Sequence, residues 1–327
     1  MGSPDIELSC AFPPRPDVVE LVVLAEQLGY RRAWLFDSPA LYGDVWMALA
    51  RCAEATSAIG LGPGVLVPSL RHPMVNAAAT AELARLAPGR VAVAVGTGFT
   101  GRFVLGQQPM TWAATERYLH QFIGLLRGET VEIDGSPCRM IHPDGWVADR
   151  PVGVEVIVGA NGPKGLAVAG DVGADGVISI FGPQEGWDRC SLFGYGTVLD
   201  DGEEIGSARV LDAAGAGAAV VFHGMYEAGA DLLDGFEGGP IWRSAIEEFP
   251  EAERHLHTHE QHFVSMTDRD AAAVTPELIA TTTWTASIDD LRSRMAGTAA
   301  AGVTEFVYGP MGTDPERELR AFRALID

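Results

Sequence analysis

The first hundred residues alternate short apolar segments with amphipathic ones, and this rhythm constrains the fold more than any other feature of the chain. We expect strands at 6–11, 33–36, 59–67 and 90–95, and helices at 17–28, 44–57 and 73–86. In the fourth strand Val91, Val93 and Val95 alternate with alanines, so both faces are apolar. Strands buried on both faces are typical of parallel sheets covered by helices. The sequence therefore predicts an α/β fold.

Two parallel architectures fit this rhythm: the (β/α)8 TIM barrel and the doubly wound sheet that binds dinucleotides. Residues 96–101 match the dinucleotide pattern G-x-G-x-x-G. In that pattern a helix begins at once, whereas here Gly106 and Pro109 follow and the next expected helix starts near Thr111. We therefore expect a single (β/α)8 TIM barrel over residues 1–327, with a glycine-rich loop at the carboxyl end of its fourth strand.

The charge balance argues against two classes of partner. With 44 acidic and 23 basic residues, the net charge is −21, and nucleic acid or an anionic membrane surface would repel the chain. The four cysteines form no C-x-x-C pair, and no stretch of about 18 apolar residues indicates a signal peptide or membrane span. These features argue against a nucleic-acid or membrane-surface partner and indicate a cytoplasmic protein.

Motifs along the chain resemble those of one family. They read LGYRRAWLFDS at 28–38, TSAIGLG at 56–62, RHP at 71–73, APGR at 87–90, GANGPKG at 159–165, ADGVI at 174–178 and AGVTEFVY at 301–308. The chain resembles the luciferase-like flavin and deazaflavin oxidoreductases, a superfamily of (β/α)8 barrels that includes methylenetetrahydromethanopterin reductase. The resemblance matches 181–285 poorly and implies insertions near 128–151 and 181–285 at the C-terminal face of the barrel.

Both insertions carry turn signals. The Asp134-Gly135 and Asp144-Gly145 turns predict a small hairpin in 128–151, and the resemblance places an insertion of this kind at the substrate mouth. The stretch from Phe181 to Gly206 is rich in glycine and acidic residues, so we expect a loop at the same end.

The ends of the second and third strands hold the first site candidates. A barrel places Asp37 at the catalytic face, and the resemblance implies that it faces the cofactor ring; the alternative is an N-cap of the next turn. Some relatives have histidine after this aspartate, where this chain has Ser38, which we place among the cofactor-binding residues. The resemblance also implies a cis peptide between Gly64 and Val65 that backs the ring; the alternative is a plain glycine bend.

Two glycine-containing loops are candidates for binding the cofactor phosphate, because each combines backbone amides with one cation; the alternative for both is a turn that simply demands glycine. The second loop also opens a helix, whose first N–H groups are free to bind an anion. The candidates are Thr97, Gly98, Thr100, Gly101 and Arg102 in the first loop, and Asn161, Gly162, Pro163 and Lys164 in the second.

Four of the eight histidines fall between residues 255 and 262. Helical spacing groups His255, His259 and His262, whereas strand spacing groups His255, His257 and His259, and no cysteine completes a known metal-ligand pattern. We expect no metal here, and the alternatives are a packed or solvated segment and a proton donor in the substrate pocket. In the second case His259 and His262, with Asp37, are the predicted catalytic residues.

The resemblance implies an oxidoreductase that transfers hydride between the deazaflavin coenzyme F-420 and a small organic substrate. One alternative is a monooxygenase that uses reduced FMN, which forms a peroxide that the deazaflavin, with carbon in place of N5, cannot form. A second alternative, from another class, is a flavin-binding protein without turnover. The resemblance also implies a homodimer.

Overall fold

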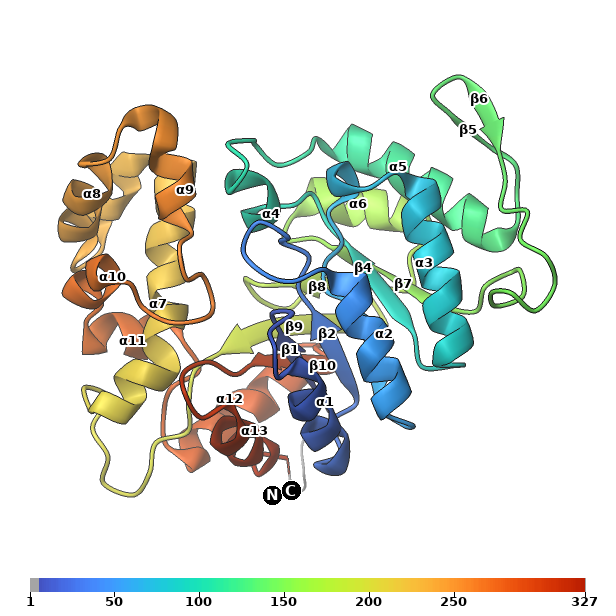
Figure 1. Cartoon of the computed structure of the whole chain (residues 1–327). Coiled ribbons are helices and arrows are strands. Elements are labelled where there is room, and N and C mark those ends of the chain that lie inside the picture. The colour runs from blue at the N-terminus through green and yellow to red at the C-terminus, as the bar shows by residue number, and fades with distance from the viewer. Residues whose placement is uncertain (1–5, 327) are drawn as a thin grey trace.

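The computed structural model describes residues 6–326 and contains an eight-stranded parallel sheet that curls into a nearly closed barrel (Figure 1). The strand order is β3-β2-β1-β10-β9-β8-β7-β4. The first and last strands along the chain, β1 and β10, are therefore neighbours. Parallel bridges from Leu61 to Val91 and from Leu66 to Val95 join the two edges. The expected barrel is confirmed, and the doubly wound alternative is wrong. The strands are β1 (Glu7–Phe12), β2 (Arg32–Leu35), β3 (Gly60–Pro63), β4 (Ala92–Val95), β7 (Glu155–Gly159), β8 (Gly176–Ser179), β9 (Cys190–Tyr195) and β10 (Glu305–Gly309).

Helices cover the outside of the barrel, and polar side chains begin several of them. Asp44 accepts hydrogen bonds from the N–H groups of the next helix, and Thr111 and Ser287 do the same for theirs. The expected helix starts at 44 and near Thr111 are confirmed. Among residues 6–326, no helix combines the length and apolarity needed to cross a membrane. The covering helices are α1 (Val18–Gln27), α2 (Val45–Ala55), α3 (Pro73–Leu86), α5 (Trp112–Arg127), α6 (Pro163–Asp171), α12 (Ile288–Ala300) and α13 (Pro315–Arg323).

Side chains fill the inside of the barrel. Trp34 is 1% exposed and packs in a buried cluster with Ala92, Ala94 and Ile157. A Cβ atom on Gly62 would lie 1.9 Å from the carbonyl oxygen of Ala92, so only glycine allows this close approach. Because the interior is packed, a ligand has to bind at the loops that follow the strands.

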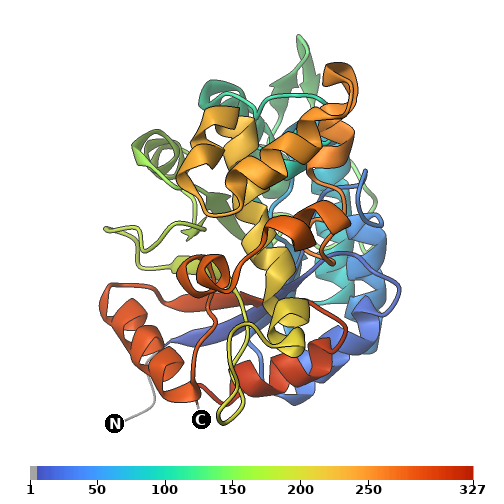
Figure 2. The same ribbon diagram turned by 90° about the vertical axis from the view of Figure 1, so that its left-hand side faces the viewer.

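A helical insertion follows β9 and therefore lies at the C-terminal face, as expected for the 181–285 region (Figures 1 and 2). It has its own buried core, with Phe222, Trp242 and Ile246 at its centre. Short turns complete the chain at this face, namely η1 (Pro68–Leu70) and α4 (Thr100–Phe103) in the loops after β3 and β4. The insertion consists of α7 (Ala208–Ala228), η2 (Ala230–Gly235), α8 (Gly239–Glu247), η3 (Glu251–Glu253), α9 (Arg254–Thr258), α10 (Asp268–Ala273) and α11 (Pro276–Thr282).

The expectation of a loop from Phe181 to Gly206 is wrong over Cys190–Tyr195, which form the barrel strand β9. This strand pairs with β8 and β10. Its apolar pattern is interrupted by Ser191, whose hydroxyl donates a 2.5 Å hydrogen bond to the buried Glu305 of β10. Since Ser9 of β1 also donates to Glu305, three polar residues share the buried interior, and periodicity alone gives a weak strand signal here.

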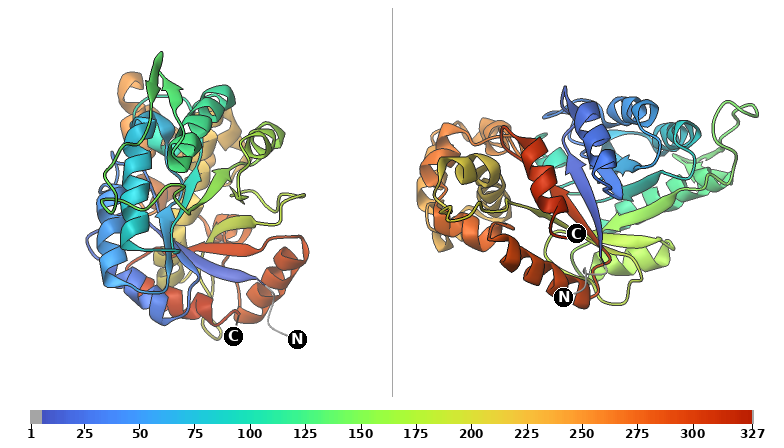
Figure 3. Two further views of the ribbon diagram at one scale, coloured as in Figure 1. Left: turned by 90° about the vertical axis from the view of Figure 1, so that its right-hand side faces the viewer. Right: turned by 90° about the horizontal axis from the view of Figure 1, so that it is seen from below.

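The predicted hairpin is present as β5 (Val131–Ile133) and β6 (Ser136–Cys138), joined at Asp134 and Gly135 with φ of 51° and 78°. Its expected place at the substrate mouth is wrong. The hairpin connects the end of α5 to the start of β7, so it lies at the amino ends of the strands. Figure 3 shows it at the opposite end of the molecule from the helical insertion.

Candidate functional site

The loops after β3, β4 and β7 meet at Val65. The peptide between Gly64 and Val65 is cis, which confirms the prediction made for this bond. A Cβ atom on Gly96 would lie 2.9 Å from Val65 Cγ2, and one on Gly159 would lie 3.2 Å from Val65 Cγ1. Glycine at both positions therefore lets the Val65 side chain lie between the ends of β4 and β7. Val65 marks the centre of this side of the mouth.

Strand pairing brings the two predicted phosphate loops together. β4 and β7 are neighbours, with Val95 paired to Val158, so the loops that leave them start side by side. Sequence reasoning proposed the two loops separately. Their adjacency follows from the closed barrel, so the two loops can be considered as one candidate site.

Packing explains the glycines of the loop after β4. Gly98 has φ of +81°, and a Cβ atom there would lie 2.5 Å from Val67 Cγ1. A Cβ atom on Gly101 would lie 3.0 Å from the carbonyl oxygen of Asp37. Arg102 is tied to neighbouring loops, because its guanidinium donates to Gln108 O at 2.6 Å and to Ser69 Oγ at 2.5 Å. Thr97 is buried at the base of this loop, which contains the one-turn helix α4 where we expected only loop.

The loop after β7 is more open. The helix α6 begins at Pro163 as predicted, and no side chain caps its first N–H groups. A Cβ atom on Gly162 would meet nothing within 4 Å. Asn161 Oδ1 accepts hydrogen bonds from Ser179 Oγ and Ile180 N at 3.0 and 2.8 Å, which fixes this loop to the end of β8. The start of α6 therefore offers unoccupied donors at the mouth.

Lys164, the only lysine of the chain, is exposed beside these donors. In the described part of the chain it makes no hydrogen bond and no ion pair. A free cation beside a helix N-terminus suits an anionic group.

Asp37 lies at the end of β2, as predicted, and its side chain is 1% exposed. Arg71 Nη1 donates to both carboxylate oxygens at 2.8 and 2.9 Å, and the N–H of Val67 donates at 3.2 Å. Burial raises the pKa of Asp37, and the hydrogen bonds and charge of Arg71 oppose that rise. The N-cap alternative is wrong, because the carboxylate binds the loop after β3. Ser38 is buried next to Asp37.

Sequence reasoning missed Arg71 as the partner of Asp37. The signal was available, since β2 and β3 were expected to be neighbours and Arg71 follows β3. Arg71 also binds Asp44 at 2.8 Å, so one guanidinium joins two carboxylates at the rim.

An aromatic cluster connects the helical insertion to the barrel. Phe263 of the insertion packs on Phe36, Phe193 and Tyr195, with ring centroids 5.3 to 5.7 Å apart. Phe36 follows β2, and the other two side chains come from β9. The sequence pattern did not identify this cluster because β9 was not predicted.

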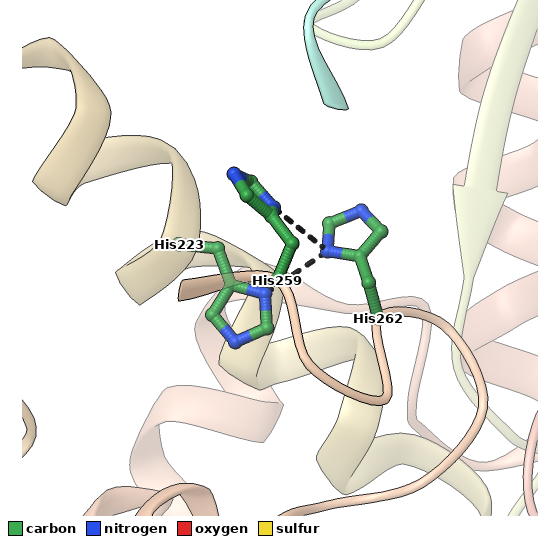
Figure 4. A group of neighbouring side chains, drawn as sticks. All are labelled: His223, His259 and His262. Atoms are coloured by element: carbon green, nitrogen blue, oxygen red, sulfur yellow. Dashed lines mark hydrogen bonds between the residues drawn. The ribbon is translucent and has the colours of Figure 1, made fainter. Parts of the chain in front are cut away.

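Three histidines gather where the insertion meets the loop after β4 (Figure 4). His223 on α7 and His259 and His262 after α9 are 1%, 2% and 5% exposed. One nitrogen from each ring can be chosen so that all three lie within 4.8 Å of one another. The predicted pair His259 and His262 is therefore brought together, whereas His257 instead stacks on Phe249 at a centroid distance of 3.8 Å.

Burial disfavours the protonated form of two of these rings, His223 and His262. Burial lowers the pKa of His262 well below its usual value, and His259 and His223 lower it further. Burial also lowers the pKa of His223, while Asp270 opposes the shift. Burial opposes ionisation of Asp270 too, but its hydrogen bond to His223, the charge interaction with that ring and the bond from Trp242 lower its pKa to about 2.

Adjacent residues of α4 connect the histidines to the region of Asp37. Thr100 Oγ1 lies 3.3 Å from His262 Nε2, and Gly101 packs on the backbone of Asp37. Sequence reasoning missed His223, because it lies on another helix and no spacing rule relates it to 255–262.

Comparisons with known proteins agree with this architecture. The family model described as "Luciferase-like monooxygenase" matches residues 5–305. The chain is 37% identical over 193 residues to an F420-dependent glucose-6-phosphate dehydrogenase of Beutenbergia cavernae, covering 52% of this chain and 54% of that protein. It is 34% identical over 162 residues to a 5,10-methylenetetrahydromethanopterin reductase of Methanolobus tindarius, covering 47% of each. The chain thus spans about half the length of these curated relatives.

A solved structure extends the likeness over the whole fold. The coenzyme F420 dependent tetrahydromethanopterin reductase from Methanopyrus kandleri superposes with a TM-score of 0.71 at 18% identity, covering 98% of both chains. At this identity the superposition supports the fold alone. Together with the family model, these findings place the chain in the luciferase-like family of oxidoreductase enzymes.

Proposed function

We propose that this protein is an oxidoreductase that binds coenzyme F-420 at the C-terminal mouth of the barrel and transfers hydride between it and a small organic substrate. The observation that carries the proposal is the meeting of Val65 with two adjacent loops, one of which has unoccupied N–H donors and the free Lys164. The name of the F420-dependent glucose-6-phosphate dehydrogenase to which the chain is 37% identical over 193 residues supports the choice of cofactor.

The residues at the mouth fit both ends of such a cofactor. The first turn of α6, with Lys164, suits its anionic phosphate. Exposed apolar side chains from the loops after β4 and β8 offer surface to a planar ring. They are Phe99, Leu105, Ile180 and Phe181, which are 48%, 43%, 47% and 75% exposed. When bound, the deazaflavin supplies the hydride chemistry.

The protein's own groups orient the reactants and supply the proton. In this proposal Val65 supports the ring, and Thr97, Gly98, Thr100, Gly101 and Arg102 line the cofactor beside the second loop. Hydride addition to a polarised bond leaves an anionic atom, which an acid has to protonate. Asp37 lies at the correct strand end, and burial raises the pKa of its carboxyl although the hydrogen bonds and charge of Arg71 oppose that rise. Its role, and those of His259 and His262, stay predictions.

A reduced-FMN monooxygenase is the second candidate, and the description of the matching family model favours it. A protein that binds flavin without turnover is the third candidate. The two enzymes differ in their need for oxygen, because a monooxygenase consumes oxygen and hydride transfer with F-420 does not.

Turnover under two atmospheres tests the proposal. We expect the absorbance of oxidised F-420 to fall when glucose 6-phosphate or another alcohol is the hydride donor, or that of reduced F-420 to be lost when methylenetetrahydromethanopterin is the acceptor. Whichever reaction occurs should run at the same rate under air and under argon. Consumption of oxygen with reduced FMN, and no turnover with F-420 under argon, would make the monooxygenase correct. Tight cofactor binding without turnover for any donor or acceptor would support the third candidate, a protein that binds flavin without turnover.

A further inference from the structure

The three buried histidines present ring nitrogens to one another rather than to solvent. Nδ1 of His262 lies 2.9 Å from Nδ1 of His223 and 3.4 Å from Nδ1 of His259 (Figure 4). Tetrahedral zinc with bonds of about 2.0 to 2.1 Å holds its nitrogen ligands about 3.3 Å apart. These two distances bracket this spacing, and one nitrogen from each of the three rings lies within 4.8 Å of the other two, so the rings are close enough to share one metal ion.

An oxygen atom lies near the outward-facing nitrogen of each ring. Asp270 Oδ1 lies 3.4 Å from His223 Nε2, Glu227 Oε1 lies 3.4 Å from His259 Nε2, and Thr100 Oγ1 lies 3.3 Å from His262 Nε2. Asp270 is itself held by Trp242 Nε1 at 2.7 Å and by Thr267. Metal-binding histidines have such an oxygen partner on the nitrogen that does not bind the metal.

The ring protons cannot satisfy all the inward nitrogens. A neutral imidazole has one N–H, and a carboxylate only accepts, so an Nε2 proton on His223 or His259 faces a carboxylate and leaves the lone pair of that ring on Nδ1. Both lone pairs face His262 Nδ1, which can donate one proton at most. His259 Nε2 makes no hydrogen bond within residues 6–326, although Glu227 is near it. A cation at the centre would bind all three lone pairs.

We propose that His223, His259 and His262 form a mononuclear zinc site, with each ring binding through Nδ1 and a water molecule completing the tetrahedron. Three neutral imidazoles without a thiolate suit a divalent transition metal, and zinc accepts a three-histidine set with one open position. This inference replaces the expectation of no metal, which considered only 255–262. It also competes with direct proton donation by His259 and His262, because the metal would bind their lone pairs.

The site would join α7 to the segment that carries Phe263. His262 precedes Phe263, whose ring packs on the ends of β2 and β9, and the hydroxyl of Tyr42 donates to the carbonyl oxygen of His262. Zinc would therefore hold the helical insertion in place against the barrel mouth. This role is independent of the cofactor.

The test measures zinc in the full-length protein. The protein is stripped with a chelator, reloaded with zinc, freed of excess metal by gel filtration and analysed by mass spectrometry for metals. We expect about one zinc per chain in the unsubstituted protein and at least a tenfold loss in each of H223A, H259A and H262A. H255A removes a neighbouring histidine of α9 outside the group and should keep its zinc.

Two results overturn the proposal: an unsubstituted protein that retains no zinc, and zinc that remains in all three variants. Because a variant could fail to fold, cobalt(II) is also added to the stripped unsubstituted protein. Strong visible absorption of tetrahedral cobalt, with no sulfur-to-metal charge-transfer band, supports a nitrogen site. A weak octahedral spectrum contradicts it.

Discussion

The loss of the Lys164 ammonium group should weaken binding of F-420 while leaving the fold intact. The side chain is exposed and has no partner in the described structure, so truncation removes no internal contact. A hydrogen bond to a charged group contributes about 1.5 to 3 kcal/mol, and exposure reduces this value because solvent screens the pair. We therefore expect Lys164→Ala to cost about 1 to 2 kcal/mol, a rise in Kd of about 5- to 30-fold.

Fluorescence titration with F-420 at two salt concentrations measures this effect. The Kd of the unsubstituted protein should rise with salt more steeply than that of Lys164→Ala, since one phosphate contact is lost. Lys164→Arg keeps the charge and serves as the matched control. Because Lys164 is the only lysine, amine-reactive labelling of this side chain can be followed by peptide mass spectrometry, and F-420 should protect it. An unchanged Kd together with unprotected labelling would refute the assignment.

Three further predictions concern the mouth. Phe263→Ala should lower the free energy of unfolding by about 2 to 3 kcal/mol, because three aromatic contacts of a half-buried ring are lost; denaturant unfolding measures this, and a change below 0.5 kcal/mol, on the order of a surface substitution, contradicts it. Gly98→Ala should cost about 1 to 3 kcal/mol, since its φ is +81° and its Cβ would meet Val67; an unchanged melting temperature would show that the loop adapts. Asp37→Asn should slow single-turnover chemistry by about 10²- to 10⁴-fold at nearly constant cofactor affinity; an effect confined to Kd would make Asp37 a positioning residue, held by Arg71.

The regular part of the barrel could be predicted from the sequence because its signals are local. Asp44, Thr111 and Ser287 cap their helices through bonds to residues two or three positions away. Pro163 is also a local signal, because proline is favoured in the first turn of a helix and α6 begins at this residue. Such contacts depend on chain neighbours alone, so a single sequence contains them.

The missing parts depend on contacts between distant segments. β9 carries Ser191 in the barrel interior because Glu305 lies on the adjacent strand, and no local pattern records that pairing. His223 meets His262 only after α7 and the segment after α9 have packed together. The resemblance also gave the wrong end for the hairpin at 131–138, which the chain order of α5 and β7 could have corrected.

A side-by-side titration of the purified protein with F-420 and FMN tests the central claim most directly. The account predicts that F-420 binds at least tenfold more tightly, on the order of 1.4 kcal/mol, and that Lys164→Ala weakens the binding of F-420. Binding of FMN with the higher affinity, unaffected by Lys164→Ala, would contradict both the cofactor assignment and the phosphate site.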